Sequence, residues 1–282
     1  MMRYNRVILY LLLALAALAM FAPILLMLST SLKSMDEIRN GSLFDLPHDP
    51  SLAAWGKAWV GRCTNDVCEG VGNYFGNSFR IVLPALVLSV GLGSITGYAL
   101  SLRQVRHADI LFALLLIGLF IPPQVTLYPM IILVRTLGLF GTTGGVILAH
   151  VVWGLAFTTL MFRNFFRSVP ADLVKAVRVD GAGFWASYWY IMLPLSLPVF
   201  AVAVILQFTY TWNDFLFGLT FAARESQPVT VALNNLVGSQ FGEQEYNVNM
   251  AATMLTALPT VLVYLCSGRL FVRGIAAGAV KG

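Results

Sequence analysis

The sequence is poor in charged residues. Only 11% of its 282 residues are Asp, Glu, Lys or Arg, while 58% are hydrophobic. An average soluble domain has about 25% charged residues, so an ordinary soluble fold is excluded. The mean hydropathy of +0.78 instead favours a membrane domain with short loops.

Cysteine and histidine are also scarce, with three residues of each. His48, His107 and His150 are scattered, so no spacing indicates a metal site. Cys63 and Cys68 lie in one segment between two apolar runs, with four residues between them. In an oxidising compartment this pair could close a small disulfide, and two unpaired thiols are the alternative.

The sequence contains no phosphate-binding loop of the form Gly-x-x-x-x-Gly-Lys-Ser/Thr, and no nucleophile paired with a base. We therefore expect that this chain does not itself hydrolyse ATP. Its net charge of +5 comes without any basic patch interleaved with aromatic residues, so nucleic acid is not an expected partner. Membrane lipid and the rules of membrane orientation explain the basic residues at the ends of apolar runs.

Six apolar runs reach the roughly 20 residues that a membrane-spanning helix requires. The predicted fold is an all-α, polytopic membrane protein with about six spans in a single transmembrane domain over residues 1–282. An outer loop over 30–78, a cytoplasmic loop over 164–194 and a C-terminal tail over 273–282 connect or follow the spans. The spans are predicted near 7–29, 79–101, 109–134, 144–163, 195–219 and 248–272.

Prolines interrupt two of these runs. Pro122, Pro123 and Pro129 lie in the third, and the fifth begins beside Pro194 and Pro198. A broken helix persists in a membrane only where neighbouring helices or a water-lined cavity satisfy the freed backbone groups. The breaks therefore favour a transport pathway over a simple anchor.

Lys and Arg are unevenly divided between the two sides of the predicted membrane. The outer pieces carry fewer of them over considerably more loop, which predicts a topology with both termini in the cytoplasm. This orientation also places the 164–194 loop in the cytoplasm. The basic residues on the cytoplasmic side would be Arg3, Arg6, Arg103, Arg106, Arg163, Arg167, Lys175, Arg178, Arg269, Arg273 and Lys281.

The loop between the fourth and fifth runs is more organised than a simple connection requires. Apolar residues recur there at helical spacing, and Asp180 with Gly181 breaks the run, because Gly tolerates the left-handed conformation that ends helices. An aromatic-rich segment follows and Pro194 closes it. The pattern predicts a helix, a turn and a second helix outside the bilayer, typical of a docking element; a solvated amphipathic loop is the alternative. The apolar stripe consists of Leu173, Ala176 and Val177.

These residues resemble the cytoplasmic loop of ABC-importer permeases, in which Glu-Ala-Ala, two further residues, Asp-Gly-Ala and a downstream Ile-x-Leu-Pro recur. The matching residues are Lys175-Ala176-Val177, Asp180-Gly181-Ala182 and Ile191-Met192-Leu193-Pro194. Lys175 replaces the family's Glu and Val177 its second Ala. The resemblance implies that this loop couples the chain to an ATPase, but the Lys at the Glu position leaves the usual salt bridge in doubt.

The resemblance covers essentially the whole chain and is greatest to the second permease subunit of maltose-type carbohydrate importers. It implies an inner-membrane heterodimer with a sister permease, two ATPase subunits that bind ATP and Mg, and a periplasmic sugar-binding protein. It further implies alternating access, a C-terminal tail at Lys281 and Gly282 that reaches the ATPase dimer, and no cofactor on this chain. The similar segments are Pro23 to Ile38, Asn77-Ser78-Phe79, Trp212 to Leu216 and Phe271 to Gly282.

Polar residues inside membrane spans are costly and are functional candidates by default. Gln207, Asn213 and Asp214 are expected to share a face of the fifth span and to line a pathway; alternatively, Asp214 lies at the outer interface. Gln124, directly after the Pro122-Pro123 pair, is a second pathway candidate. Gly93-x-x-x-Gly97 in the second span favours helix packing over mechanism.

Three other functions remain open from the sequence. An ABC permease for another solute, such as glycerol phosphate, would need Arg or Lys facing the pathway, and none lies mid-span. A secondary transporter driven by an ion gradient would place paired acids mid-membrane, where only Asp214 qualifies. A membrane-embedded enzyme would need convergent His, Asp or Glu. Among sugars, the outer loop with Trp55 and Trp59 is similar to that of glucose- or mannose-type uptake systems.

Overall fold

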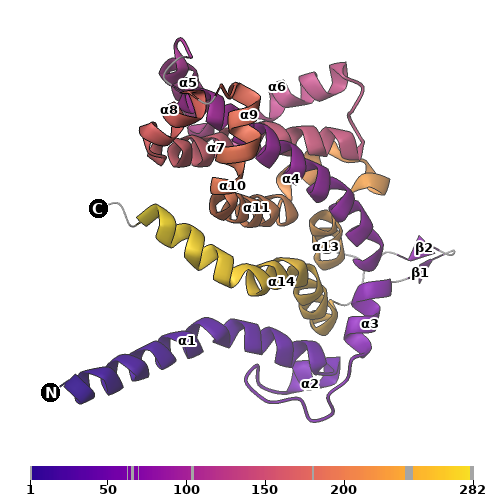
Figure 1. The fold of residues 1–282 in the computed structure, drawn as a ribbon. Coiled ribbons are helices and arrows are strands. Elements are labelled where there is room, and N and C mark those ends of the chain that lie inside the picture. Colours follow the sequence, from indigo (N-terminus) through magenta and orange to yellow (C-terminus); the bar gives the residue numbers. More distant parts are fainter. Residues whose placement is uncertain are drawn as a thin grey trace. The chain divides into compact units, whose positions relative to one another are not determined.

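The computed structural model describes residues 2–61, 63–64, 67–68, 70–102, 105–179, 181–238 and 244–279. The chain forms two compact units. The first comprises the chain up to Tyr74 together with Ala232–Leu258, and the second comprises Phe75–Val231 with the chain from Pro259 onward. Figure 1 shows the element order. The single-domain interpretation of the sequence stays a prediction.

The first unit is built on α1 (Met2–Leu32), α2 (Met35–Asn40), α3 (Ala53–Val60) and the first part of α14 (Tyr246–Ala279). The apolar side chains of α1 between Val7 and Phe21 are exposed, as expected of a helix that lipid or a partner covers. Ser34 caps α2 by accepting a hydrogen bond from the Glu37 amide at 3.2 Å. Lys57 of α3 pairs with Glu245, just before α14, at 2.8 Å.

The segment between α3 and α4 (Gly72–Ser101) contains a small antiparallel hairpin of β1 (Cys63–Thr64) and β2 (Val67–Cys68). The backbone of Cys63 pairs directly with that of Cys68. The side chains of both cysteines lie outside the described part of the structure, so the disulfide stays a prediction.

The second unit contains the remaining part of α4 and the helices from α5 to α12. Its continuous apolar helices are α4 and α7 (Thr143–Ser168), which approach each other closely. A Cβ atom added at Gly97 would lie 2.7 Å from the Cβ of Phe162, and one at Gly93 would overlap Thr158. The small residues therefore bring the two backbones together, which confirms the helix-packing interpretation of Gly93-x-x-x-Gly97.

Two further apolar segments of this unit are bent helix pairs. α5 (Ala108–Phe120) and α6 (Pro123–Thr136) meet at 107°. The second pair consists of the segment Phe184–Leu195, formed by α9 (Phe184–Ser187), the π-helix η1 (Tyr188–Met192) and α10 (Leu193–Leu195), and of α11 (Leu197–Trp212), which meets it at 76°. The first bend falls at Pro122 and the second at Ser196, near the prolines that predicted them.

The described residues thus hold four continuous helices long and apolar enough to cross a membrane, or up to six spans if each bent pair counts as one. This confirms the predicted all-α, polytopic fold. The continuous candidates are Arg6–Leu32, Gly72–Ser101, Thr143–Ser168 and Tyr246–Gly268. The sidedness of the spans stays a prediction from their flanking charges.

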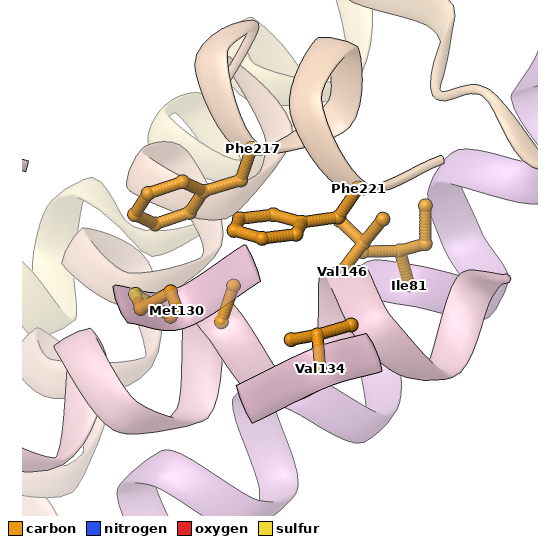
Figure 2. Close-up of a cluster of buried hydrophobic side chains, with 7 residues drawn as sticks. Ile81, Met130, Val134, Val146, Phe217 and Phe221 are labelled. Carbon is orange, nitrogen blue, oxygen red and sulfur yellow. The ribbon is translucent and has the colours of Figure 1, made fainter. Parts of the chain in front are cut away.

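A buried apolar cluster fixes α6 against α7 in the second unit (Figure 2). It also holds α12 (Leu216–Phe221), the first of three short elements, which continue with the 3-10 turn η2 (Arg224–Ser226) and α13 (Val229–Val237). Because α12 is anchored there, the turn that precedes it has a fixed position against α7. The cluster consists of Ile81, Met130, Val134, Val146, Ala149, Phe217 and Phe221.

Candidate coupling site and transport pathway

The loop after α7 folds as the predicted helix and turn. α8 (Ala171–Val179) begins directly after Pro170, where the fixed φ of proline suits a helix start. Gly181 then adopts a φ of +82°, the left-handed region that favours glycine. The Ala182 amide donates to the Val177 carbonyl at 3.1 Å and closes the turn. Asp180 lies outside the described residues, so its contacts stay a prediction.

α8 turns one residue of its apolar stripe, Val177, onto its own chain and leaves Leu173 and Ala176 exposed. Val177 is 8% exposed, and together with the half-exposed Leu173 it lines a shallow hollow against Tyr98 and Met192. Val177 is therefore covered by its own chain, and the expectation that the stripe supplies a helix-in-groove contact stays a prediction for Leu173 and Ala176.

α8 also has an accessible side, on which a charged pair lies beside small apolar side chains. The Lys175 ammonium lies 3.1 Å from the Asp172 carboxylate, and the two side chains are 75% and 93% exposed. An exposed pair of this kind contributes at most about 0.5 kcal/mol, so it does not hold Lys175 in place. Val179 lies on the same helix with 87% of its surface exposed. A partner that covers α8 therefore meets Lys175, Ala176 and Val179.

The second helix of the loop is longer than the sequence suggested. We expected it to close at Pro194, but the helical path continues through α10 to Leu195 and breaks only at Ser196. Pro194 has no N–H to donate, and a proline ring crowds the preceding turn. The preceding residue, Leu193, donates instead to Tyr188 five residues back, which widens the turn into the π-helix η1.

A charged cluster that sequence reasoning missed lies at the end of α7 that precedes the loop. Arg163 is 4% exposed, and its guanidinium pairs with Asp109 at the start of α5 and donates to the Leu100 carbonyl at 3.2 Å. Arg167 also reaches Asp109, at 2.7 Å. The cluster ties the beginning of α5 and the end of α4 to α7. Its signal in the sequence was Arg163, a basic residue at the inner edge of an apolar run.

Gln207 lies deep in the packing of the second unit. It is 2% exposed, and its amide donates to Thr211 at 3.4 Å. A Cβ added at Gly154 of α7 would lie 2.8 Å from the Gln207 side-chain carbonyl carbon, so the amide occupies the space that this glycine leaves.

The predicted shared face of Gln207, Asn213 and Asp214 is wrong, because α11 ends at Trp212. Asn213 is exposed just beyond the helix and accepts a hydrogen bond from Thr260 of α14 at 3.3 Å. Asp214 lies in the turn that follows. The three residues therefore do not form one continuous helical stripe.

Asp214 is occupied within the chain. Its carboxylate accepts hydrogen bonds from the Phe217 and Gly218 amides at 3.0 and 3.2 Å, which caps α12. Its carbonyl accepts from Thr230 at the start of α13, and His150 of α7 lies 3.6 Å from its carboxylate. The side chain is 11% exposed. Through these contacts Asp214 stabilises the turn between α11 and α12. Its role in a transport pathway stays a prediction.

The other predicted site residues have simpler surroundings. Gln124 is exposed in the first turn of α6, directly after the bend between α5 and α6. Lys281 and Gly282 of the predicted ATPase-contacting tail lie outside the described residues. Within the described part of the chain, no three His, Cys, Asp or Glu side chains lie close enough together to hold a metal ion.

Comparison with known families decides the class of the protein. The model of the family described as "Binding-protein-dependent transport system inner membrane component" matches residues 75–275. The chain belongs to this family. The matched region includes the bent pairs, α8 and the Gly181 turn, and the permease is accordingly a multi-pass protein of the inner membrane.

Two relatives and one solved structure illustrate the range of similarity. A probable ABC transporter permease protein of Pyrococcus horikoshii is 41% identical over 173 residues, which span 61% of the permease and 62% of that protein. The melibiose/raffinose/stachyose import permease MelC of Bacillus subtilis is 31% identical over 98% of the permease and 96% of MelC. A bacterial ABC transporter involved in alginate import has a chain of similar fold, with a TM-score of 0.79, 22% identity and coverage of 95% and 97%.

Proposed function

We propose that the permease is one of two membrane subunits of an ATP-driven importer that moves a sugar across the inner membrane by alternating access. Its partners would be a sister permease, two ATPase subunits and a periplasmic sugar-binding protein. The permease itself would bind no cofactor, and ATP and Mg would be held by the ATPase subunits. The sequence contains no phosphate-binding loop, which supports the assignment of ATP binding to separate subunits.

The observation that carries the proposal is the short helical hairpin that follows α7, formed by α8 and by the segment Phe184–Leu195, which contains α9, η1 and α10. α8 buries Val177 on its own chain while it exposes Lys175, Ala176 and Val179. An element that is fixed on one side and open on the other can transmit a displacement that a partner imposes on its open side. A solvated amphipathic loop would not need the buried side.

The sugar class rests on the nature of the relatives. MelC, which is similar over nearly its whole length, is named for the import of melibiose, raffinose and stachyose. A phosphate ester would instead favour an unpaired basic group along the pathway. The buried guanidinium that the structure describes in α7, Arg163, is paired with Asp109. The glucose- or mannose-type interpretation of the outer loop stays a prediction.

The test is transport by the reconstituted complex in proteoliposomes, with its binding protein outside and ATP inside. A panel of monosaccharides, disaccharides and glycerol phosphate would be compared for uptake and for stimulation of ATP hydrolysis. We expect uptake of a sugar that depends on both ATP and the binding protein. Uptake of glycerol phosphate alone, or sugar uptake driven by an ion gradient without ATP, would replace this proposal with one of its alternatives.

A further inference from the structure

The hairpin rests on α4 through a buried hydrogen bond. The hydroxyl of Tyr188, at the start of η1, lies 2.7 Å from the hydroxyl of Ser94, in the last third of α4. Ser94 is fully buried and Tyr188 is 2% exposed. A hydrogen bond between two hydroxyls shielded from water is more costly to lose than one at the surface, because both groups would remain without a partner.

Aromatic contacts surround this hydrogen bond. Tyr98 lies one helical turn after Ser94 on α4, and its ring centroid is 4.8 Å from that of Phe184 and 5.5 Å from that of Tyr188. It also contacts Phe166 of α7 at 5.6 Å. Tyr98 is 2% exposed. It therefore contacts α7 on one side and the second helix of the hairpin on the other.

The π-helix directs Tyr188 toward α4. Within η1, Tyr188 and Met192 are buried, whereas Trp189 and Tyr190 are 53% and 81% exposed. π-helical turns are rare and occur mostly as single wide turns at functional sites. Here the wide turn follows from Pro194, and it leaves the buried pair four residues apart on the side that contacts α4.

We propose that Ser94, Tyr98 and Tyr188 form the joint through which movement of the hairpin reaches α4. The proposal rests on the coupling function proposed above. The chain itself connects the hairpin to α7 and to α11, so those helices must follow any displacement. α4 has no such covalent connection to the hairpin, and its movement depends on side-chain contacts. The three residues are positioning residues; they are not expected to contact the sugar.

The sharpest test removes the hydrogen bond and leaves the ring packing unchanged. Tyr188→Phe and Ser94→Ala do this from opposite sides, and the quantity to measure is ATP hydrolysed per sugar transported in proteoliposomes. We expect the ratio to rise about fivefold in each variant, the factor to which one lost buried hydrogen bond corresponds. The ratio in the double variant should not exceed that in either single variant, because both changes remove the same bond and the double variant leaves no buried hydroxyl without a partner.

Matched controls come from the same elements. Tyr190→Phe removes an exposed hydroxyl two residues further along η1, and Ser101→Ala removes a hydroxyl that donates within α4, to the Tyr98 carbonyl. Both should leave the ratio unchanged. The proposed joint would be contradicted if the effects of Tyr188→Phe and Ser94→Ala on the ratio were additive, or if neither variant changed the ratio.

Variants of Tyr98 provide a second test, with a larger expected change in the ratio. Tyr98→Leu should raise the ratio more than Tyr188→Phe does, and Tyr98→Phe should restore it, because the aromatic ring is retained. Equal behaviour of Tyr98→Leu and Tyr98→Phe would argue against the joint. If Tyr98→Leu does not assemble with its partners, Tyr188→Phe still decides the question. If the wild-type complex shows no ATP-dependent uptake, the proposed coupling function itself is wrong. If Gly181→Pro uncouples ATP hydrolysis from uptake but Tyr188→Phe and Ser94→Ala leave the ratio unchanged, only the proposed joint is wrong.

Discussion

The hairpin after α7 and the turn after α11 are both short irregular connections, but their polar groups are used differently. In the turn, the Asp214 carboxylate is taken up by the amides of Phe217 and Gly218. In the hairpin, the Lys175 ammonium pairs with the exposed carboxylate of Asp172 on its own helix. A polar group that the chain already satisfies serves the fold, and one that it leaves accessible is available to a partner.

The apolar groups of the two regions show the same contrast. Phe217 and Phe221 fix α12 in an apolar cluster together with residues of α6 and α7 (Figure 2). The hairpin buries Val177 and Tyr188 but leaves Val179, Trp189 and Tyr190 exposed. The turn between α11 and α12 thus has its polar and apolar groups covered by its own chain, while the hairpin has one buried side and one exposed side. Variants in the hairpin should therefore alter coupling, and variants in the turn should alter stability.

The largest effect is expected for Gly181→Pro. Proline fixes φ near −65°, which is incompatible with the left-handed +82° of Gly181. Membrane insertion should persist, because no span is altered, but sugar uptake should fall at least tenfold while basal ATP hydrolysis continues. Uptake and hydrolysis measured in the same proteoliposomes check this.

Gly183→Ala is the control for Gly181→Pro. Gly183 has a φ of −73°, and a Cβ added there meets nothing within 4 Å. This variant should behave as wild type. Undiminished sugar uptake by Gly181→Pro would count heavily against the docking role of the hairpin and would remove the contrast between the two regions.

Reversal of the Lys175 charge should have the next largest effect. If the ATPase carries an acidic partner where Lys175 replaces the family's Glu, Lys175→Glu should weaken the complex about tenfold, because an attractive pair becomes a repulsive one. The affinity of the purified ATPase for the membrane subunits measures this. Lys175→Gln removes the charge without reversing it, so its affinity for the ATPase should lie between those of the wild type and Lys175→Glu. Tighter association of the Glu variant would refute the charge-switch hypothesis.

A smaller effect is expected in the turn. Asp214→Ala removes the cap of α12 at a cost of about 1 kcal/mol, so the melting temperature of the complex should fall by no more than about 2 °C. Asp214→Asn retains an acceptor oxygen and should preserve most of the stability. The KM for sugar should not change in either variant if Asp214 only organises the turn. A raised KM in Asp214→Asn at normal stability would assign it to the pathway instead.

The sequence predicted the fold because the signals were long or specific. Runs of about 20 apolar residues identify spans, and the prolines near residues 122 and 194 identified the two bends. Gly181 was predicted to end α8 because few other residues adopt its backbone conformation. These features depend on residues close together in the chain.

What the sequence could not give depends on contacts between distant segments. The periodicity of Leu173, Ala176 and Val177 shows that α8 has an apolar side, but not whether its own chain or a partner covers that side. Similarly, an acid near the end of an apolar run gives no sign that the next helix uses it as a cap, as Asp214 does. Ser94 and Tyr188 are 94 residues apart, and neither is unusual in its own helix.

The smallest effect is expected for Gln124→Ala, which tests whether the bend between α5 and α6 contributes to the pathway. Gln124 is exposed in the first turn of α6, so its removal should change stability by less than about 0.5 kcal/mol. If its amide faces the sugar, the KM should rise a few-fold with little change in the maximal rate. Thr136→Ala, at the exposed other end of α6, is the control and should leave the KM unchanged. An equal KM in both variants would remove Gln124 from the pathway, and the bend would then serve packing alone.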